Sequence, residues 1–175
     1  MSLLADERVR LRAVEPQDLE IVYRIENDTE LWGCSDTSVP YSRYAVKQFL
    51  SDTANDIYSD RQIRLIAECV GNGVPVGFAD LTGFSPRHLR AEVGVVVFPE
   101  YRCAGYGESI LSLLEAYACR HLLIHNIYAV VAENNEPAVR LFRKAGFDFK
   151  ALLADWLACA DGYSNAWLCQ KVLCL

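Results

Sequence analysis

A strand, a turn and a helix in consecutive residues, from position 91 to position 119, constrain the fold of this chain most. Val93 to Phe98 form an apolar run typical of a buried strand, and Pro99-Glu100-Tyr101 predicts a turn. The segment Arg102 to Gly107 then opens a predicted helix. Its apolar residues follow positions i, i+1, i+4, i+7 and i+8, which here are Ile110, Leu111, Leu114, Tyr117 and Ala118. We therefore expect one face of this helix to pack against a sheet.

The residues that open this helix predict an anion-binding site. The first backbone N–H groups of a helix have no partner within it, and the helix dipole adds partial positive charge there, so a phosphate can bind. Gly105 and Gly107 lack a Cβ, which allows unusual backbone angles and leaves room for a pyrophosphate, while Arg102 can add a charged contact. The pattern is no dinucleotide fingerprint, because Ile110 replaces the third glycine, and no Walker loop, because no Lys-Ser/Thr follows.

A second motif begins roughly 30 residues later, after a predicted strand at 127–131. Asn135 is expected to cap a helix, Pro137 fits its first turn and Gly146 its end. The patterns Arg102-x-x-Gly105-x-Gly107 and Asn135-x-x-Ala138-x-x-x-Phe142-x-Lys144-x-Gly146-Phe147 together resemble the GNAT superfamily of acetyl-CoA-dependent N-acetyltransferases. The resemblance covers nearly the whole chain, and it is greatest to the spermidine and ribosomal-protein N-terminal acetyltransferases.

This resemblance implies a mixed α/β (α+β) fold in one domain over residues 1–175, with a mostly antiparallel central sheet flanked by helices. In the family, the strand before the anion site bulges and splays from the next strand, which leaves a notch for the acetyl-pantetheine arm of acetyl-CoA. The implied cofactor-binding residues are Val95, Val97, Arg102, Cys103, Ala104, Gly105, Tyr106, Gly107, Asn135 and Phe142. Backbone N–H groups near Val95 and Val97 would stabilise the charge on the thioester oxygen. We expect no metal.

Acetyl transfer to an amine requires a base, because a lysine-like amine has a pKa near 10.4 and is mostly protonated at neutral pH. Glu92 begins the strand that leads to the anion site, and a glutamate on this strand often acts as the base through water in the family. Glu92 is therefore the expected catalytic residue; a surface charge or a substrate anchor is the alternative. Asp80 is a second candidate.

The chain departs from the family pattern at Phe142, where many relatives carry a tyrosine that protonates the leaving thiolate, and at Cys103-Ala104. Two functions therefore stay open. One is direct transfer of acetyl to a primary amine, which could belong to a polyamine, a small amine or a protein N-terminus. The other is a GNAT-fold sensor or scaffold that binds acetyl-CoA but has lost the chemistry.

Composition limits the number of domains, the kind of substrate and the location that we expect for this protein. The 175 residues and 52% hydrophobic content suit a single domain with a real core. A net charge of −6 argues against nucleic acid as a partner and favours a cationic substrate. The sequence shows no run of ~20 apolar residues and no signal peptide, so we expect a cytoplasmic protein without membrane contact. A homo-oligomer is possible.

The seven cysteines favour free thiols over a disulfide or zinc framework. Their number is odd and no C-x-x-C pair occurs among Cys34, Cys69, Cys103, Cys119, Cys159, Cys169 and Cys174. Most lie in apolar segments and are expected to be buried, whereas Cys103 is expected to be the most exposed.

The remaining pattern predicts the order strand, two helices, three antiparallel strands, helix, strand, helix and two strands. Segment 27–41 is either a wall of the acceptor site or a solvated linker with a packed Trp32. A hairpin joins 64–70 to 74–82, and Asp161-Gly162 predicts another between 149–158 and 164–173.

Overall fold

A seven-stranded sheet forms the centre of the computed structural model, which describes residues 2–33, 37–52 and 56–173. The strand order is β1-β2-β3-β4-β5-β7-β6, and every neighbouring pair is antiparallel except β4 and β5, which are parallel. The mixed, mostly antiparallel sheet is as predicted. Its strands are β1 (Val9–Ala13), β2 (Ile63–Cys69), β3 (Pro75–Ser85), β4 (Arg90–Val97), β5 (Asn126–Ala132), β6 (Asp148–Cys159) and β7 (Gly162–Val172).

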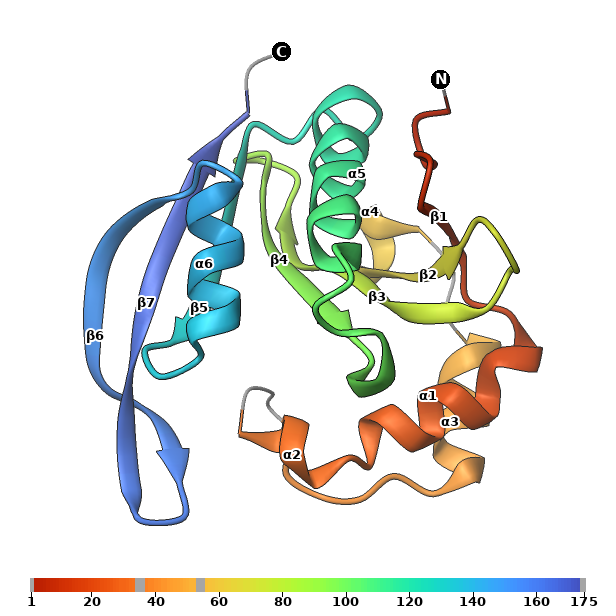
Figure 1. The fold of residues 1–175 in the computed structure, drawn as a ribbon, viewed down its shortest axis with the longest axis horizontal. Helices are drawn as coiled ribbons and strands as arrows, with labels where there is room; N and C mark the ends of the chain where they lie inside the picture. The colour runs from red at the N-terminus through yellow and green to blue at the C-terminus, as the bar shows by residue number, and fades with distance from the viewer. Residues whose placement is uncertain (1, 34–36, 53–55, 174–175) are drawn as a thin grey trace.

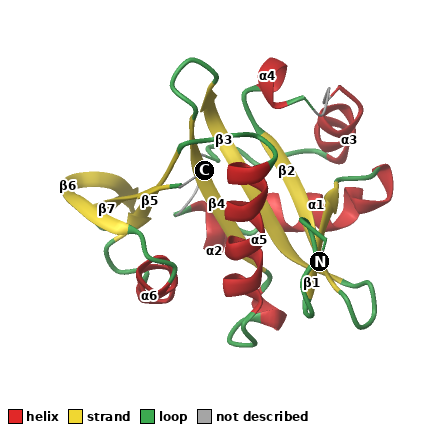
Figure 2. Ribbon diagram, turned by 90° about the horizontal axis from the view of Figure 1, so that it is seen from above, coloured by secondary structure: helices red, strands yellow, loops and turns green. Residues whose placement is uncertain are grey.

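Helices cover both faces of this sheet (Figures 1 and 2). They are α1 (Leu19–Glu26), α2 (Thr29–Trp32), α3 (Arg43–Asp52), α4 (Ile57–Asp60), α5 (Tyr106–Arg120) and α6 (Glu136–Lys144). The predicted order of elements is confirmed, with two short helices added. Asp28 caps α2 and Asp56 caps α4, each by accepting a hydrogen bond from the backbone N–H two residues later.

Each face of the sheet has its own hydrophobic core. On one face, α5 buries four of its five predicted apolar residues together with Leu113, and packs them against Leu81 and Val93; Tyr117 is half-buried. On the other face, α1 and α3 pack against the sheet. That second core consists of Val22, Ile25, Val46, Ile66, Phe78 and Phe98.

Strands β4 and β5 pair over only three residues and then separate. Their register runs from Arg90 opposite Asn126 to Glu92 opposite Tyr128. The predicted splay is therefore present. The predicted bulge in β4 is wrong, because the register between β3 and β4 is unbroken from Val97 to Glu92. The irregularity lies in β3 instead, where Gly83 takes a left-handed φ of +57°.

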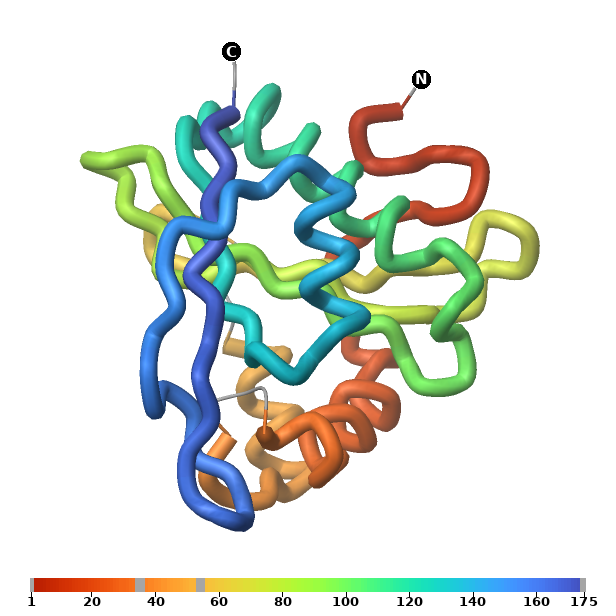
Figure 3. Tube along the Cα trace, turned by 60° about the vertical axis from the view of Figure 1, so that its left-hand side comes forward, coloured from red at the N-terminus to blue at the C-terminus, as the bar shows by residue number. Residues whose placement is uncertain are grey.

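The β6 and β7 hairpin turns at Gly162 as predicted, and lies at the same end of the molecule as α2 (Figures 1 and 3). The beginning and end of the described chain lie at the opposite end (Figure 3). Among the described residues, no helix combines the length and the apolar content that crossing a membrane requires.

The five described cysteines are free. Cys103 is exposed as predicted, but Cys159 is exposed too, and Cys169 alone of the five is fully buried. The expectation of mostly buried thiols is therefore wrong for this set: Cys159 ends the solvated edge strand β6, and Cys69 and Cys119 are half-buried. Cys34 and Cys174 lie outside the described residues.

Candidate active site

The loop before α5 has the exposed backbone that an anion site needs. Residues 102–105 are all exposed, and Gly105 caps the helix with a left-handed φ of +83°. Gly107 differs, because it lies within α5, and a Cβ there would meet Leu141 at 3.5 Å and Val97 at 3.6 Å, which are ordinary contacts. The expected backbone freedom is thus required at Gly105, and for Gly107 the expectation of unusual backbone angles is wrong.

Arg8 is a second cation at this loop, and sequence analysis missed it. Its Nη1 donates a hydrogen bond to the Ala104 carbonyl oxygen at 3.0 Å, while Arg102 donates through Nε to the Val97 carbonyl at 3.3 Å. Arg8 and Ala104 are 96 residues apart in the chain, so no local pattern links them. Two guanidinium groups therefore lie beside the exposed N-terminus of α5, where each can reach a phosphate.

Tyr106 fixes the first turn of α5 to the end of β2. Its hydroxyl contacts the Cys69 sulfur at 3.6 Å, and its ring lies edge-on to Tyr101 with centroids 6.2 Å apart. The hydrogen bond from Tyr106 lowers the pKa of the Cys69 thiol. These contacts hold the start of α5 against the sheet.

The two sequence motifs meet at the separation of β4 and β5. Asn135 caps α6 as predicted, since its side-chain oxygen accepts a hydrogen bond from the Ala138 N–H at 3.2 Å. Leu141 of α6 lies close to Gly107. In the described part of the chain, no strand pairs with the β5-facing edge of β4 beyond Glu92, so β4 has no strand partner on this side at Val95 and Val97.

Phe142 belongs to the core. It is 5% exposed, and its ring packs edge-to-face against Phe147 with centroids 4.9 Å apart. Contact between this ring and a cofactor stays a prediction.

Glu92 lies on the face of the sheet opposite α5. Residues directly opposite each other in neighbouring strands point to the same face, and Glu92 pairs with Thr82 on one side and Tyr128 on the other. Burial, followed by the negative charge of Glu92, raises the pKa of the Tyr128 phenol. Glu92 is half-buried and lies where β4 and β5 separate; its role as a base stays a prediction.

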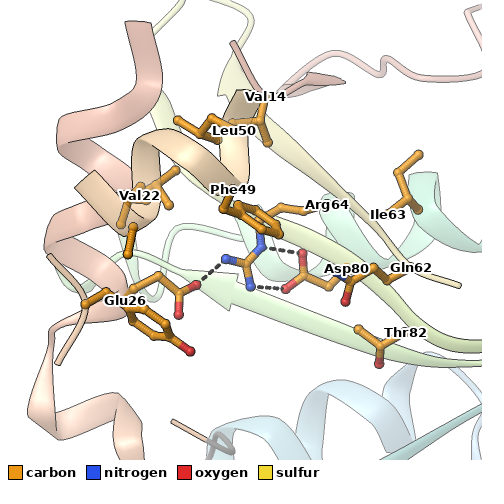
Figure 4. A pocket seen from close by; sticks show the side chains of 13 residues that line it. Val14, Val22, Glu26, Phe49, Leu50, Gln62, Ile63, Arg64, Asp80 and Thr82 are labelled. Carbon is orange, nitrogen blue, oxygen red and sulfur yellow. Dashed lines mark hydrogen bonds and ion pairs between the residues drawn. The ribbon is translucent and has the colours of Figure 1, made fainter. Parts of the chain in front are cut away.

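A cavity of about 350 Å³ opens on this same face, between the sheet and helices α1 and α3 (Figure 4). At its centre, Arg64 makes a bidentate pair with Asp80, with both N–O distances 2.8 Å, and a further ion pair with Glu26. Its guanidinium also stacks on Phe78, 4.8 Å from the ring centroid. Burial by itself lowers the pKa of Arg64, but the charges and hydrogen bonds of Asp80 and Glu26 outweigh it and raise that pKa. Because Asp80 is held by Arg64, it is poorly placed to be the base.

Of the described residues of segment 27–41, Tyr41 reaches this cavity. Tyr41 lines the cavity, and its backbone is fixed by Asn27, which accepts from the Tyr41 N–H at 2.8 Å and donates to the Tyr41 carbonyl at 3.0 Å. Trp32 is half-buried and donates through its indole N–H to the Glu26 carbonyl at 2.9 Å. Trp32 is therefore packed, as one of the two alternatives expects, and Tyr41 lines a cavity; that this cavity is the acceptor site stays a prediction.

Residues 8–148 match the protein family described as "Acetyltransferase (GNAT) domain". The chain belongs to the GNAT acetyltransferase family. It is 27% identical to the spermidine N(1)-acetyltransferase of Escherichia coli K12 over 161 residues, which cover 90% of this chain and 82% of that protein. The predicted resemblance to the spermidine branch is confirmed, and the protein is an N-acetyltransferase.

Solved structures share the fold. The spermidine N-acetyltransferase of Vibrio cholerae in complex with CoA and spermine has a TM-score of 0.84 at 22% identity, with 96% of this chain and 97% of that chain covered. A dodecameric structure of spermidine N-acetyltransferase from Vibrio cholerae has a TM-score of 0.81 at 22% identity, with 96% and 95% covered.

Proposed function

We propose that this N-acetyltransferase takes the acetyl group of acetyl-CoA and transfers it directly to the primary amine of a small aliphatic acceptor. One observation carries the proposal. The strand that loses its β5 partner after Glu92 leads directly into the exposed N-terminus of α5. A thioester in the notch and a pyrophosphate at the helix thus lie along one continuous stretch of chain.

The cofactor-binding roles follow from this arrangement. The pyrophosphate binds the N–H groups of the loop Arg102-Cys103-Ala104-Gly105-Tyr106-Gly107, with Arg102 and Arg8 supplying positive charge. The pantetheine arm runs along the open edge of β4 at Val95 and Val97. Asn135 and Phe142, from α6, border the other side of the notch.

The reaction needs one base and a tolerable leaving group. Glu92, directly or through water, removes a proton from the ammonium. The neutral amine nitrogen then attacks the thioester carbonyl, the C–N bond forms, and the C–S bond breaks to release the thiolate. The nitrogen, which becomes positively charged on attack, passes its second proton to water or to the departing thiolate and leaves a neutral amide. Backbone N–H groups of β4 stabilise the oxygen that gains charge. A thiol has a pKa near 8.5, so its thiolate leaves without full protonation, and Phe142 in place of a tyrosine does not prevent the reaction.

Several further properties belong to the same proposal. An aliphatic amine acceptor is supported by the spermidine named for the relatives and by the net charge of −6. A homo-oligomer is supported by the dodecamer of a structural relative. The continuous sheet supports one domain over residues 1–175, and we place the enzyme in the cytoplasm.

Release of free thiol from acetyl-CoA in the presence of an amine panel tests the function. The panel should include spermidine, alkylamines, diamines and a peptide with a free N-terminus, and mass spectrometry should identify the acetylated product. We expect amine-dependent thiol release. Tight binding of acetyl-CoA without release for any amine would favour the sensor or scaffold alternative, and absence of acetyl-CoA binding would refute the proposed site.

A further inference from the structure

We infer that the preferred acceptor is an amine with one positive charge on an apolar chain, and that Arg64 sets this preference against polyamines. The inference rests on the proposed function, because it assigns the cavity of Figure 4 to the amine substrate.

The position of the cavity supports this assignment. The α5 face of the sheet is filled by the core around Leu81, Val93 and Leu114, so an amine cannot approach the notch from that side. The cavity lies on the other face. Asp80 and Thr82 line it, and they lie directly opposite Gly94 and Glu92 of β4. An amine that enters the cavity therefore arrives next to the proposed base.

The charge of the cavity limits what it can bind. Of the described residues that line it, three are charged, namely Glu26, Arg64 and Asp80. Two carboxylates and one guanidinium leave one net negative charge in the lining itself, while the Glu92 carboxylate next to it receives the proton of the reacting amine. The charge of the lining suits one ammonium group, because Arg64 already pairs with both lining carboxylates and repels further cations.

The rest of the lining favours an apolar substrate chain. Besides the uncharged polar residues Gln62 and Thr82, it consists of apolar groups, namely Val14, Val22, Ala45, Val46, Phe49, Leu50 and Ile63 with the Tyr41 ring. Each methylene buried there should improve kcat/KM about fourfold, which corresponds to ~0.8 kcal/mol. A second ammonium on the same chain would instead lie against apolar side chains or beside Arg64, where burial of a charge without a partner is unfavourable.

Two amines of equal length provide the test. Hexylamine and 1,5-diaminopentane each have a chain of seven heavy atoms and differ in one end group, a methyl or a second ammonium. With the wild-type enzyme and saturating acetyl-CoA, we expect kcat/KM for hexylamine to exceed that for the diamine by at least tenfold. Spermidine should resemble the diamine.

Variants assign the preference to the cavity charges. Glu26→Gln removes the net negative charge and should raise KM for hexylamine about tenfold with a smaller change in kcat. The matched control is Glu20→Gln, on the same helix, where the exposed carboxylate pairs with Arg43 away from the cavity lining; its kinetics should equal wild type. Arg64→Met leaves two carboxylates and should shift the ratio at least tenfold toward the diamine.

The outcomes separate this inference from the proposed function. Acetylation of spermidine and 1,5-diaminopentane in preference to hexylamine would overturn the inference and leave the acetyltransferase function intact. No acetylation of any amine would refute the proposed function itself. If Arg64→Met fails to fold, the two-amine comparison in the wild type and the Glu26→Gln kinetics still decide the question.

Discussion

Arg8 and Gly105 approach each other so closely that a Cβ added to Gly105 would lie 2.9 Å from the Arg8 Nη1 atom. The contact joins the segment before β1 to the cap of α5. Gly105 also has φ of +83°, which side chains other than glycine rarely adopt.

Gly105→Val should weaken acetyl-CoA binding by more than tenfold in titration calorimetry. The valine would strain the left-handed backbone, displace Arg8 and fill space that the pyrophosphate needs. Gly105→Asn is the matched control for strain, since asparagine tolerates this conformation better. Gly107→Ala should fold normally, because its Cβ makes ordinary contacts. Wild-type affinity in Gly105→Val would place the pyrophosphate elsewhere.

Glu92→Gln should lower the rate of acetyl transfer by roughly 10²- to 10⁴-fold at pH 7. The loss should shrink toward pH 9, where more of the amine is already deprotonated and needs no base. The measurement is kcat/KM for one amine across this pH range, with acetyl-CoA affinity as the control. A pH profile that matches the wild type would mean that Glu92 is not the base and is a surface charge or a substrate anchor instead.

Acetyl-CoA should protect Cys103 from alkylation. Cys103 and Cys159 are exposed and should react with iodoacetamide, whereas burial raises the pKa of the Cys169 thiol to about 11 and should keep it unreactive in the native protein. Saturating acetyl-CoA should slow labelling of Cys103 at least tenfold and leave Cys159 unchanged, as followed by peptide mass spectrometry. Equal rates at Cys103 with and without cofactor would contradict its place in the cofactor site.

Phe142→Tyr should increase the rate of the chemical step only modestly. The wild-type ring is buried against Phe147, so an added hydroxyl in the same position would be buried and would cost about 1–3 kcal/mol of stability if it found no partner. Single-turnover acetyl transfer and thermal unfolding measure the two effects. An inert wild type together with an active Phe142→Tyr variant would indicate a binding protein that had lost its acid.

Asp18→Asn should destabilise the protein at pH 7 by about 1–3 kcal/mol, because Arg12 loses one charged partner but keeps Glu68 at 2.9 Å. Asp18 is buried and accepts two hydrogen bonds from Arg12 at 2.7 and 2.8 Å and one from the Glu15 N–H. Burial alone raises the pKa of Asp18, but these bonds outweigh it and lower that pKa below 3.8. The stabilisation is therefore complete above about pH 4 and is lost as pH falls through the folded pKa.

Urea unfolding of the wild type and of Asp18→Asn between pH 3 and pH 7 measures this effect. The difference between their free energies of unfolding should become smaller toward pH 3. Glu20→Gln, which removes an exposed pair, should show no comparable gap at any pH. A constant difference across the range would mean that Asp18 acts through packing rather than charge.

Local sequence patterns predicted the helices and strands, because the residues at their ends and turns mark where each of them begins or stops. Asn135 and Gly146 bound α6, and Asp161-Gly162 turns the last hairpin, as the residues themselves indicate. The splay between β4 and β5 came from the family resemblance, since no residue in either strand marks where pairing stops.

Contacts between distant segments could not be predicted in this way. The contacts of Arg8 with Ala104 and of Arg64 with Glu26 join residues far apart in the chain, whereas Arg64 and Asp80 lie opposite each other within the predicted hairpin. The burial of Phe142 depends on Phe147 and the rotation of α6, which a motif comparison does not specify. The cavity arises from packing between α1, α3 and the sheet.

Among the described residues, the β-ladder that joins strands β1 to β4 to strands β5 to β7 consists of three residue pairs. The two parts also share one hydrophobic core beneath α5, in which Ile127 and Val131 of β5 belong to the same cluster as Val93 of β4. Two ion pairs add to it, Lys171 with Glu115 at 2.6 Å and Lys144 with Glu108 at 2.7 Å. The angle between the parts therefore depends on a short seam, on this core and on two ion pairs, of which that of Lys144 with Glu108 is exposed. Because salt screens exposed pairs, the width of the notch should depend on ionic strength, whereas the pairing within each part should not.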